Sequence, residues 1–69
     1  MTVSDVEALK NWLDRIGCLP GYNEDLIDNA IFSLKNGSDY RAESSLKTLA
    51  KNLRNDGKDE AAKAVERLL

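Results

Sequence analysis

The sequence predicts an all-α fold, a compact bundle of four short helices joined by tight turns that contain glycine. Apolar residues recur at spacings of three and four in four segments, no segment alternates with period two, and turn residues separate the segments. The predicted helices span residues 4–16, 23–36, 39–55 and 58–68 of a single domain, residues 1–69. The short connections favour antiparallel neighbours. A core of three helices, with the first or the last helix packed across it, is the close alternative.

The predicted first helix begins at a capping box. In the run Ser-Asp-Val-Glu, the Ser4 hydroxyl can accept a hydrogen bond from the backbone N–H of Glu7, and Glu7 can reach back to Ser4. The buried face is expected to hold Val6, Leu9, Leu13 and Ile16. Trp12 and Ala8 fall at the flank of this face. Gly17 is expected to end the helix, before a turn that contains the only proline.

The predicted second helix carries its one aromatic side chain away from its apolar face. Asn23 is expected to cap this helix. The apolar face holds Leu26, Ile27, Ala30, Ile31 and Leu34. At about 100° per residue, Phe32, the only phenylalanine, falls roughly 170° from the centre of that face. The polar neighbours of Phe32 on the wheel are Asp25, Asp28, Asn29 and Lys35.

The third and fourth predicted helices have regular apolar stripes. Ser38 or Asp39 is expected to cap the third helix. Its stripe holds Ala42, Leu46, Leu49, Ala50 and Leu53. Gly57 separates it from the fourth helix, which begins with acidic residues that suit the positive end of a helix dipole. The fourth helix is expected to bury Ala61, Ala62, Val65, Leu68 and Leu69.

The composition leaves a small chain few stabilising devices beyond its core. Cys18 is the only cysteine, so no intramolecular disulfide forms, and the absence of histidine disfavours a zinc site. Residues 1–40 carry seven acidic and three basic side chains, whereas residues 41–69 carry five acidic and seven basic ones. A small core and two halves of opposite net charge favour a homodimer.

The sequence offers little equipment for catalysis. Cys18 has no histidine that could act as its base, so the thiol is not expected to be a nucleophile and is expected to fill an apolar gap under the turn. No glycine-rich phosphate loop or EF-hand spacing is present. We therefore expect no catalytic residue, no cofactor and no metal site, and a protein that is not an enzyme. No apolar run approaches a membrane span, and no basic segment leads into an apolar run, so we expect a cytoplasmic protein with no secretory signal.

Phe32 is the first candidate for a functional surface. An aromatic residue surrounded by polar ones has the composition of an interface hot spot. We interpret Phe32 as the anchor of a protein-binding site in which charged neighbours orient a basic partner. Those neighbours are Asp25, Asp28 and Lys35. The alternative is that the turn around Pro20, or the first helix near Trp12, covers the ring and makes it part of the core.

The third helix carries the second candidate surface. One basic ridge with an aromatic residue gathers within about 60° around the helix axis. Its members are Tyr40, Lys47, Lys51 and Arg54. Such a ridge is a minimal footprint for contacts to phosphates, although the chain as a whole is acidic, with a pI near 5.0. Nucleic-acid binding is therefore the alternative function. A helix-turn-helix arrangement of the second and third helices is disfavoured, because the first turn of the third helix holds only one good reader of bases.

The last two predicted helices resemble one tetratricopeptide hairpin in the order of their large, small and turn residues. The matching positions are Leu46, Leu49, Ala50, Leu53, Gly57 and Ala62. The resemblance implies peptide or protein binding. It departs at Glu66, where the repeat has a large apolar residue, and no second copy occurs in residues 1–42; a generic helical hairpin explains the same residues.

These observations favour a small cytoplasmic protein–protein interaction module that works by occupying the surface of a partner. An inhibitor, an adaptor or a regulatory subunit fits this description, of the kind common among phage-encoded and accessory regulators.

Overall fold

The computed structural model describes all 69 residues, of which 75% are helical and none lies in a strand. The helices are α1 (Val3–Arg15), α2 (Tyr22–Lys35), α3 (Asp39–Asn55) and α4 (Asp59–Glu66). The predicted all-α bundle of four helices is confirmed, and no predicted helix boundary is wrong by more than two residues.

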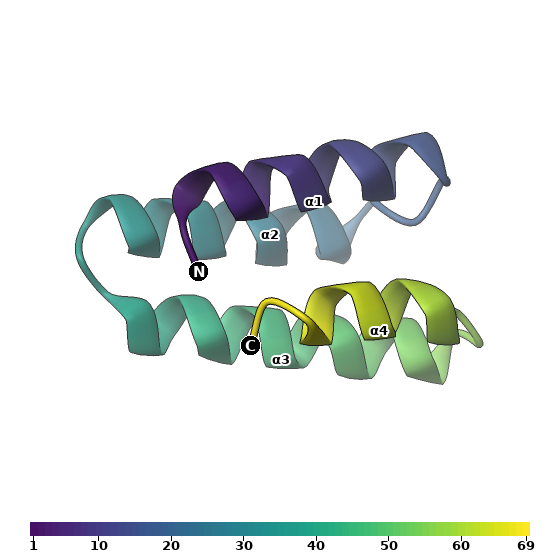
Figure 1. The fold of residues 1–69 in the computed structure, drawn as a ribbon. Coiled ribbons are helices and arrows are strands. Elements are labelled where there is room, and N and C mark those ends of the chain that lie inside the picture. The colour runs from purple at the N-terminus through teal and green to yellow at the C-terminus, as the bar shows by residue number, and fades with distance from the viewer.

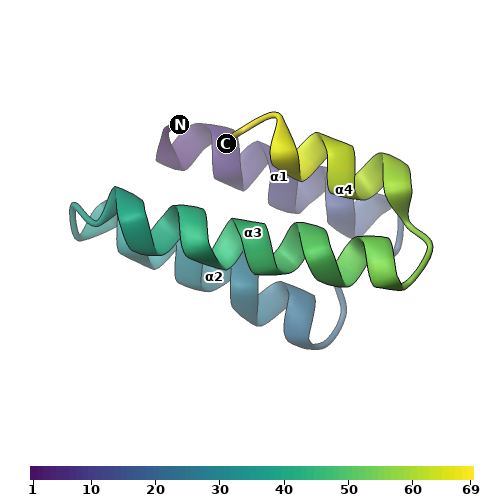
Figure 2. The same ribbon diagram turned by 90° about the horizontal axis from the view of Figure 1, so that it is seen from below.

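Two antiparallel helical hairpins form the bundle. The hairpin of α1 and α2 lies over the hairpin of α3 and α4, and the globule measures 32 × 20 × 19 Å (Figure 1). Among the four neighbouring pairs of helices, α2 with α3 and α3 with α4 pack most closely, whereas α1 and α4 have the least contact (Figure 2). The side of the bundle formed by α2 and α3 is therefore closed, and the opposite side, between α1 and α4, is open.

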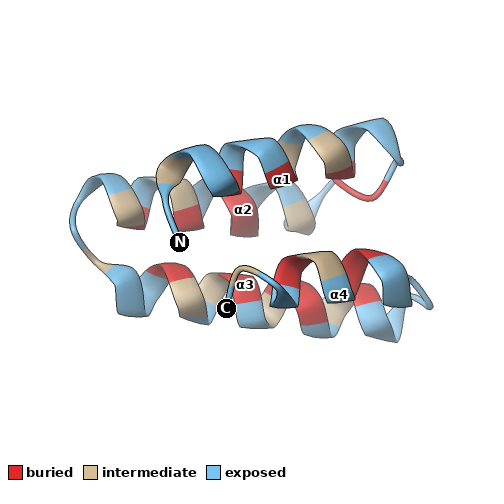
Figure 3. Cartoon of the chain, in the orientation of Figure 1, coloured by how far each residue is buried: buried red, intermediate tan, exposed pale blue.

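The core is a single cluster of 16 buried apolar residues, which lie on the inner faces of all four helices and, in the case of Cys18 and Leu19, in the turn between α1 and α2 (Figure 3). Its largest fully buried side chains are Leu13, Ile27, Leu46, Leu49, Leu53, Val6 and Val65. Cys18 is buried in this cluster beside Leu19, where it fills the space under the first turn as predicted. No buried side-chain nitrogen or oxygen lacks a hydrogen-bond partner. None of the helices has the length and apolar character needed to cross a membrane.

Three helices end in the same way, with a glycine in the left-handed region one residue after the C-cap. At the end of α2, the N–H of Gly37 donates to the carbonyl of Leu34, and the N–H of Ser38 donates to the carbonyl of Ser33. This pair of bonds is the Schellman motif, which satisfies carbonyl groups that the helix itself leaves free. The turns therefore begin where the glycines stand, as the sequence predicts.

Replacing Gly37 by alanine is expected to lower the free energy of unfolding by about 1 kcal/mol, because an L side chain is strained at positive φ. The φ of Gly37 is 78°, and an added Cβ would meet no atom within 4 Å, so the cost is conformational rather than steric. Urea denaturation followed by circular dichroism measures it. Gly37→Asn is the control, because asparagine tolerates this conformation better than alanine. Equal stability of the alanine variant and the wild type would contradict the assignment.

Two predicted N-caps are wrong. The capping box of α1 joins Thr2 and Asp5, not Ser4 and Glu7: the Thr2 N–H donates to Asp5 Oδ2 at 3.1 Å, and the Asp5 N–H donates to Thr2 Oγ1 at 3.2 Å. The same residue spacing occurs two positions earlier, and the helix begins at Val3, one residue before the predicted start. The N-cap of α2 is Gly21, without a side-chain bond. The side-chain amide of Asn23 instead donates to the carbonyl of Cys18 at 3.0 Å and so stabilises the turn between α1 and α2.

Two residues predicted to be buried are exposed. Ile16 is 45% exposed because α1 ends at Arg15, and the chain turns away from the core after that residue. Leu69 is 45% exposed because α4 ends at Glu66, so the last residues leave the helical face that the spacing assumed. The neighbouring Leu68 remains partly buried against the core, as do Ile31 and Leu34 of α2. Both residues lie just beyond helix ends, where the helical periodicity no longer determines which way a side chain points.

Candidate functional site

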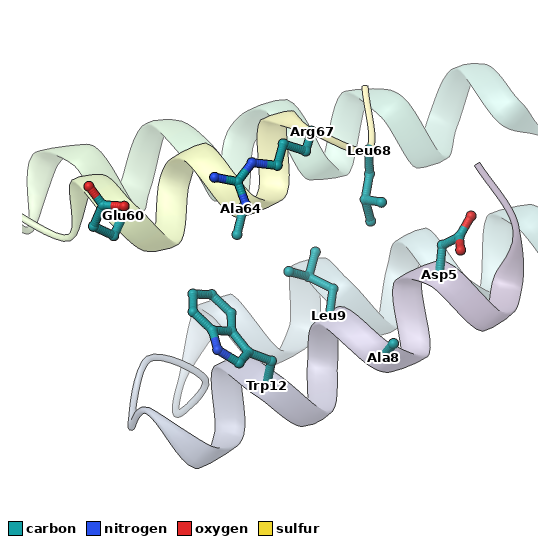
Figure 4. A pocket seen from close by; sticks show the side chains of 8 residues that line it. All are labelled: Asp5, Ala8, Leu9, Trp12, Glu60, Ala64, Arg67 and Leu68. Carbon is teal, nitrogen blue, oxygen red and sulfur yellow. The ribbon is translucent and has the colours of Figure 1, made fainter.

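A groove of about 550 Å³ runs between α1 and α4 on the open side of the bundle (Figure 4). It is lined by Asp5, Ala8, Leu9 and Trp12 from α1, and by Glu60, Ala64, Arg67 and Leu68 from α4 and the residues after it. Five of these eight residues are hydrophobic. The Trp12 ring and the Leu9 side chain point from α1 toward α4 (Figure 4). The groove thus has an apolar floor and charged residues at its rim.

The groove exists because the core buries only part of the apolar face of α1. Val6 and Leu13 are completely buried, whereas Trp12, at the flank of that face, is only partly buried against the core. On the opposite wall, the short α4 directs Ala62 and Val65 into the core and leaves Ala64 facing α1. Alanine is too small to fill the space between the two helices, so the hollow remains.

The charged residues of the groove lie at its two ends and along the α4 side. Asp5 stands at the N-terminal end of α1, and Glu60 stands at the opposite end, beyond Trp12 (Figure 4). Asp5 is already held by the capping box with Thr2. Glu60 makes only an exposed contact with Lys63, at 3.7 Å. Arg67 takes part in none of the three ion pairs of the chain. Arg67 is therefore free to meet a ligand, and Glu60 is held only by one long, exposed contact.

The predicted anchor, Phe32, is 67% exposed on the outer face of α2. Neither the turn around Pro20 nor α1 covers it, so the alternative in which Phe32 joins the core is wrong. Its binding role stays a prediction. Asp25 and Lys35 are exposed and take part in no ion pair, but Asp28 accepts a hydrogen bond from Lys10 Nζ of α1 at 2.6 Å. Asp28 thus links α1 to α2 through this ion pair, in addition to neighbouring Phe32 on the surface of α2.

The pair between Lys10 and Asp28 gives a pH prediction. The hydrogen bond to Asp28 raises the pKa of Lys10 above its ordinary value of 10.5, and the nearby charges of Asp28, Glu24 and Asp14 add to the effect. Because the pKa is higher in the folded state, the contribution of Lys10 to stability is complete below about pH 10.5 and is lost as the pH rises through the folded pKa. Asp28→Asn is expected to lower the Lys10 pKa toward 10.5. An NMR titration of the Lys10 side chain measures it, and an unchanged pKa would contradict the pairing.

The basic face of α3 is divided in the structure. Lys47, Lys51 and Arg54 border one shallow hollow, whereas Tyr40, which is 82% exposed, lies outside it. Both terminal nitrogens of Arg54 donate to the carboxylate of Glu66 on α4, at 2.7 and 2.9 Å. These bonds raise the pKa of Arg54 and join α3 to α4. The guanidinium is therefore already occupied by a carboxylate, and Glu66 places an acid among the predicted phosphate-binding cations.

Sequence reasoning missed the groove as a functional site. It placed Trp12 and Ala8 at the flank of the α1 face, and that placement was the available signal. Leu9 and Trp12 lie three residues apart on α1, but only the structure shows that α4 does not cover this part of the α1 surface. Elsewhere in the chain, no three histidine, cysteine, aspartate or glutamate side chains are placed to hold a metal ion.

Neither the models of protein families, nor the curated proteins, nor the solved structures with which the chain was compared match it. The resemblance of the α3–α4 hairpin to a tetratricopeptide repeat is thus one of residue spacing alone.

Proposed function

We propose that this chain is a small protein-binding module that acts by occupying the surface of a partner, with the groove between α1 and α4 as the contact site. The observation that carries the proposal is an apolar groove, open to solvent, that contains the only tryptophan of the chain. Tryptophan in a partly formed pocket is the residue most typical of interface hot spots. A groove of this size accepts side chains of a partner rather than a single water molecule.

The role that fits this surface is that of a cytoplasmic inhibitor, adaptor or regulatory subunit. Support comes from the chemistry of the chain: it has no histidine, and its single thiol is buried. Phe32, with the exposed Asp25 and Lys35 beside it, offers a second contact surface on α2. A partner large enough to reach both α1 and α2 would cover the groove and Phe32 together, whereas a small one would use the groove alone.

A substitution that fills the groove tests the proposal. Ala8 is exposed and lines the groove, so Ala8→Gln places a longer side chain in it while keeping a residue that favours helix. The matched control is Asn11→Gln, on an exposed position of the same helix that does not line the groove. Tagged versions of the wild type and of both variants are used to capture partners from the native cell at low salt.

We expect the wild type and Asn11→Gln to capture the same partner and Ala8→Gln to lose it, with all three proteins giving the same circular dichroism spectrum. A partner captured equally by all three would overturn the assignment of the groove. The captured protein is then identified, and its own binding surface is tested with the purified pair.

Nucleic-acid binding has less support as a function. The ion pair between Arg54 and Glu66 takes one cation of the basic face, and the net charge of the chain is −2. The affinity of a protein that contacts several phosphates falls steeply as the salt concentration rises. Retention on heparin that falls steeply between low and physiological salt would favour this function over protein binding.

Self-association is a separate prediction. The hairpin of α1 and α2 lies in the acidic residues 1–40, and α4 with most of α3 lies in the basic residues 41–69, so two copies present complementary surfaces. We expect a homodimer in sedimentation at micromolar concentration, with a melting temperature that rises with protein concentration. The dimer is expected to dissociate at high salt, because the exposed charges are screened. A monomer whose melting temperature is independent of concentration would contradict the prediction.

A further inference from the structure

We propose that the occupant of the groove is an amphipathic helix of the partner that carries a basic residue at each end of its apolar stripe. This inference rests on the proposed function and specifies the partner. It joins two observations, the shape of the space between α1 and α4 and the placement of acidic side chains at both of its ends.

The shape of the groove suits a helix. Its walls are two antiparallel helices, and its floor carries the large side chains of Leu9, Trp12 and Leu68 (Figure 4). The small side chains of Ala8 and Ala64 allow the backbone of a third helix to approach closely, as helices pack with their axes about 8–10 Å apart. A helix that docks in this way presents apolar residues at positions i, i+3, i+4 and i+7. Such a helix would complete the open side of the bundle.

The charges at the ends of the groove specify the flanks of that helix. Asp5 and Trp12 are seven residues apart on α1, which is about 10 Å along the helix axis, and Glu60 lies beyond Trp12. The two acids are therefore more than about 10 Å apart along the groove, which matches lysine or arginine residues placed two to three turns apart on a docked helix. Arg67, on the α4 side, then faces a polar or acidic residue at the edge of the stripe.

The same charges argue against a second copy of the chain as the occupant of the groove. In an antiparallel two-fold pairing of the grooves, Asp5 of one copy would meet Glu60 of the other. In a parallel pairing, Asp5 would meet Asp5 and Glu60 would meet Glu60. Either arrangement places acids together at both ends, with only Arg67 of each copy to offset the two acids of the other, which disfavours the contact. A self-association through the oppositely charged hairpins leaves the groove free.

Trp12 makes a direct test possible, because it is the only tryptophan and it lines the groove. The probes are two synthetic helical peptides without aromatic residues, which share one leucine and alanine stripe. One carries lysine at both ends of the stripe, and the other carries glutamate. Binding is followed by the emission of Trp12 at 150 mM salt, where exposed charges more than about 8 Å apart are largely screened.

We expect the lysine peptide to shift the Trp12 emission to shorter wavelength and to bind at least tenfold more tightly than the glutamate peptide. Glu60→Lys is expected to abolish that preference. Asp59→Lys is the matched control: Asp59 and Glu60 are both exposed acids in the first turn of α4, but only Glu60 lines the groove. The control variant is expected to keep the preference of the wild type.

The other outcomes overturn the inference in distinguishable ways. Equal binding of both peptides would show that the groove accepts helices regardless of the charges at the ends of their apolar stripe, and the proposed function would stand. If neither peptide binds, the basic-flanked helix is wrong as the occupant, and the capture experiment with Ala8→Gln decides separately whether the groove binds a protein. A concentration-dependent shift of Trp12 emission without peptide would assign the groove to a second copy of the chain.

Discussion

Leu49→Ala is expected to lower the free energy of unfolding by about 3 to 5 kcal/mol, the range for removing a leucine side chain from a tightly packed core. Leu49 is completely buried in the middle of α3, the helix that packs against both α2 and α4. A domain of this size has a total stability of roughly 3 to 10 kcal/mol. The substitution therefore removes a large part of that stability, and the melting temperature falls steeply. Urea denaturation followed at the helical circular dichroism band measures the loss.

Phe32→Ala is the matched comparison for that experiment. Phe32 is larger than leucine, yet it is 67% exposed, so its removal is expected to change stability by about 0.5 kcal/mol or less. A loss above about 2 kcal/mol in Phe32→Ala would show that the ring is packed in solution and would contradict both its exposure and its interpretation as a binding anchor. A small loss in Leu49→Ala would contradict the single core.

The sequence determines the fold at nearly every helix because its local signals agree. The stripe of Ala42, Leu46, Leu49, Ala50 and Leu53 is buried over its whole length, and the glycines at positions 17, 37 and 57 mark the ends of three helices. The wrong capping box of α1 arises because two local signals of equal strength compete. Thr2 with Asp5 and Ser4 with Glu7 have the same spacing, and no local feature of the sequence favours one pair over the other. Ile16 and Leu69 fit a periodic stripe that ends before they are reached.

The candidate site is harder to predict because it depends on how little α1 and α4, which are far apart in the sequence, contact one another. The exposure of Phe32 can be predicted locally: the direction of its side chain follows from the periodicity of its own helix, and its exposure is confirmed. The groove depends on the length of α4 and on its weak contact with α1, which no spacing within either helix encodes. The same limit applies to Arg54. Its place on the basic face of α3 follows from periodicity, whereas its pairing with Glu66 follows from the packing of α3 against α4.

Trp12→Leu is expected to weaken the binding of the captured partner by about 2 kcal/mol or more, which corresponds to roughly 30-fold in the dissociation constant. Leucine keeps part of the apolar contact between position 12 and the core but removes the ring that lines the groove. The variant is also expected to lose about 1 to 2 kcal/mol of stability, because Trp12 is partly buried. Isothermal titration well below the melting temperature separates the two effects.

Tyr40→Ala and Phe32→Ala complete the Trp12 experiment. Tyr40 is the most exposed aromatic residue of the chain and lies away from the groove, so its removal is expected to leave the affinity unchanged. Phe32→Ala distinguishes the two candidate surfaces on one partner. If the partner uses the groove alone, only Trp12→Leu weakens binding; if it reaches across α1 to α2, both variants do. Full affinity in Trp12→Leu together with a large loss in Phe32→Ala would move the binding site to the outer face of α2, because a hot-spot residue cannot be removed without a measurable loss of affinity.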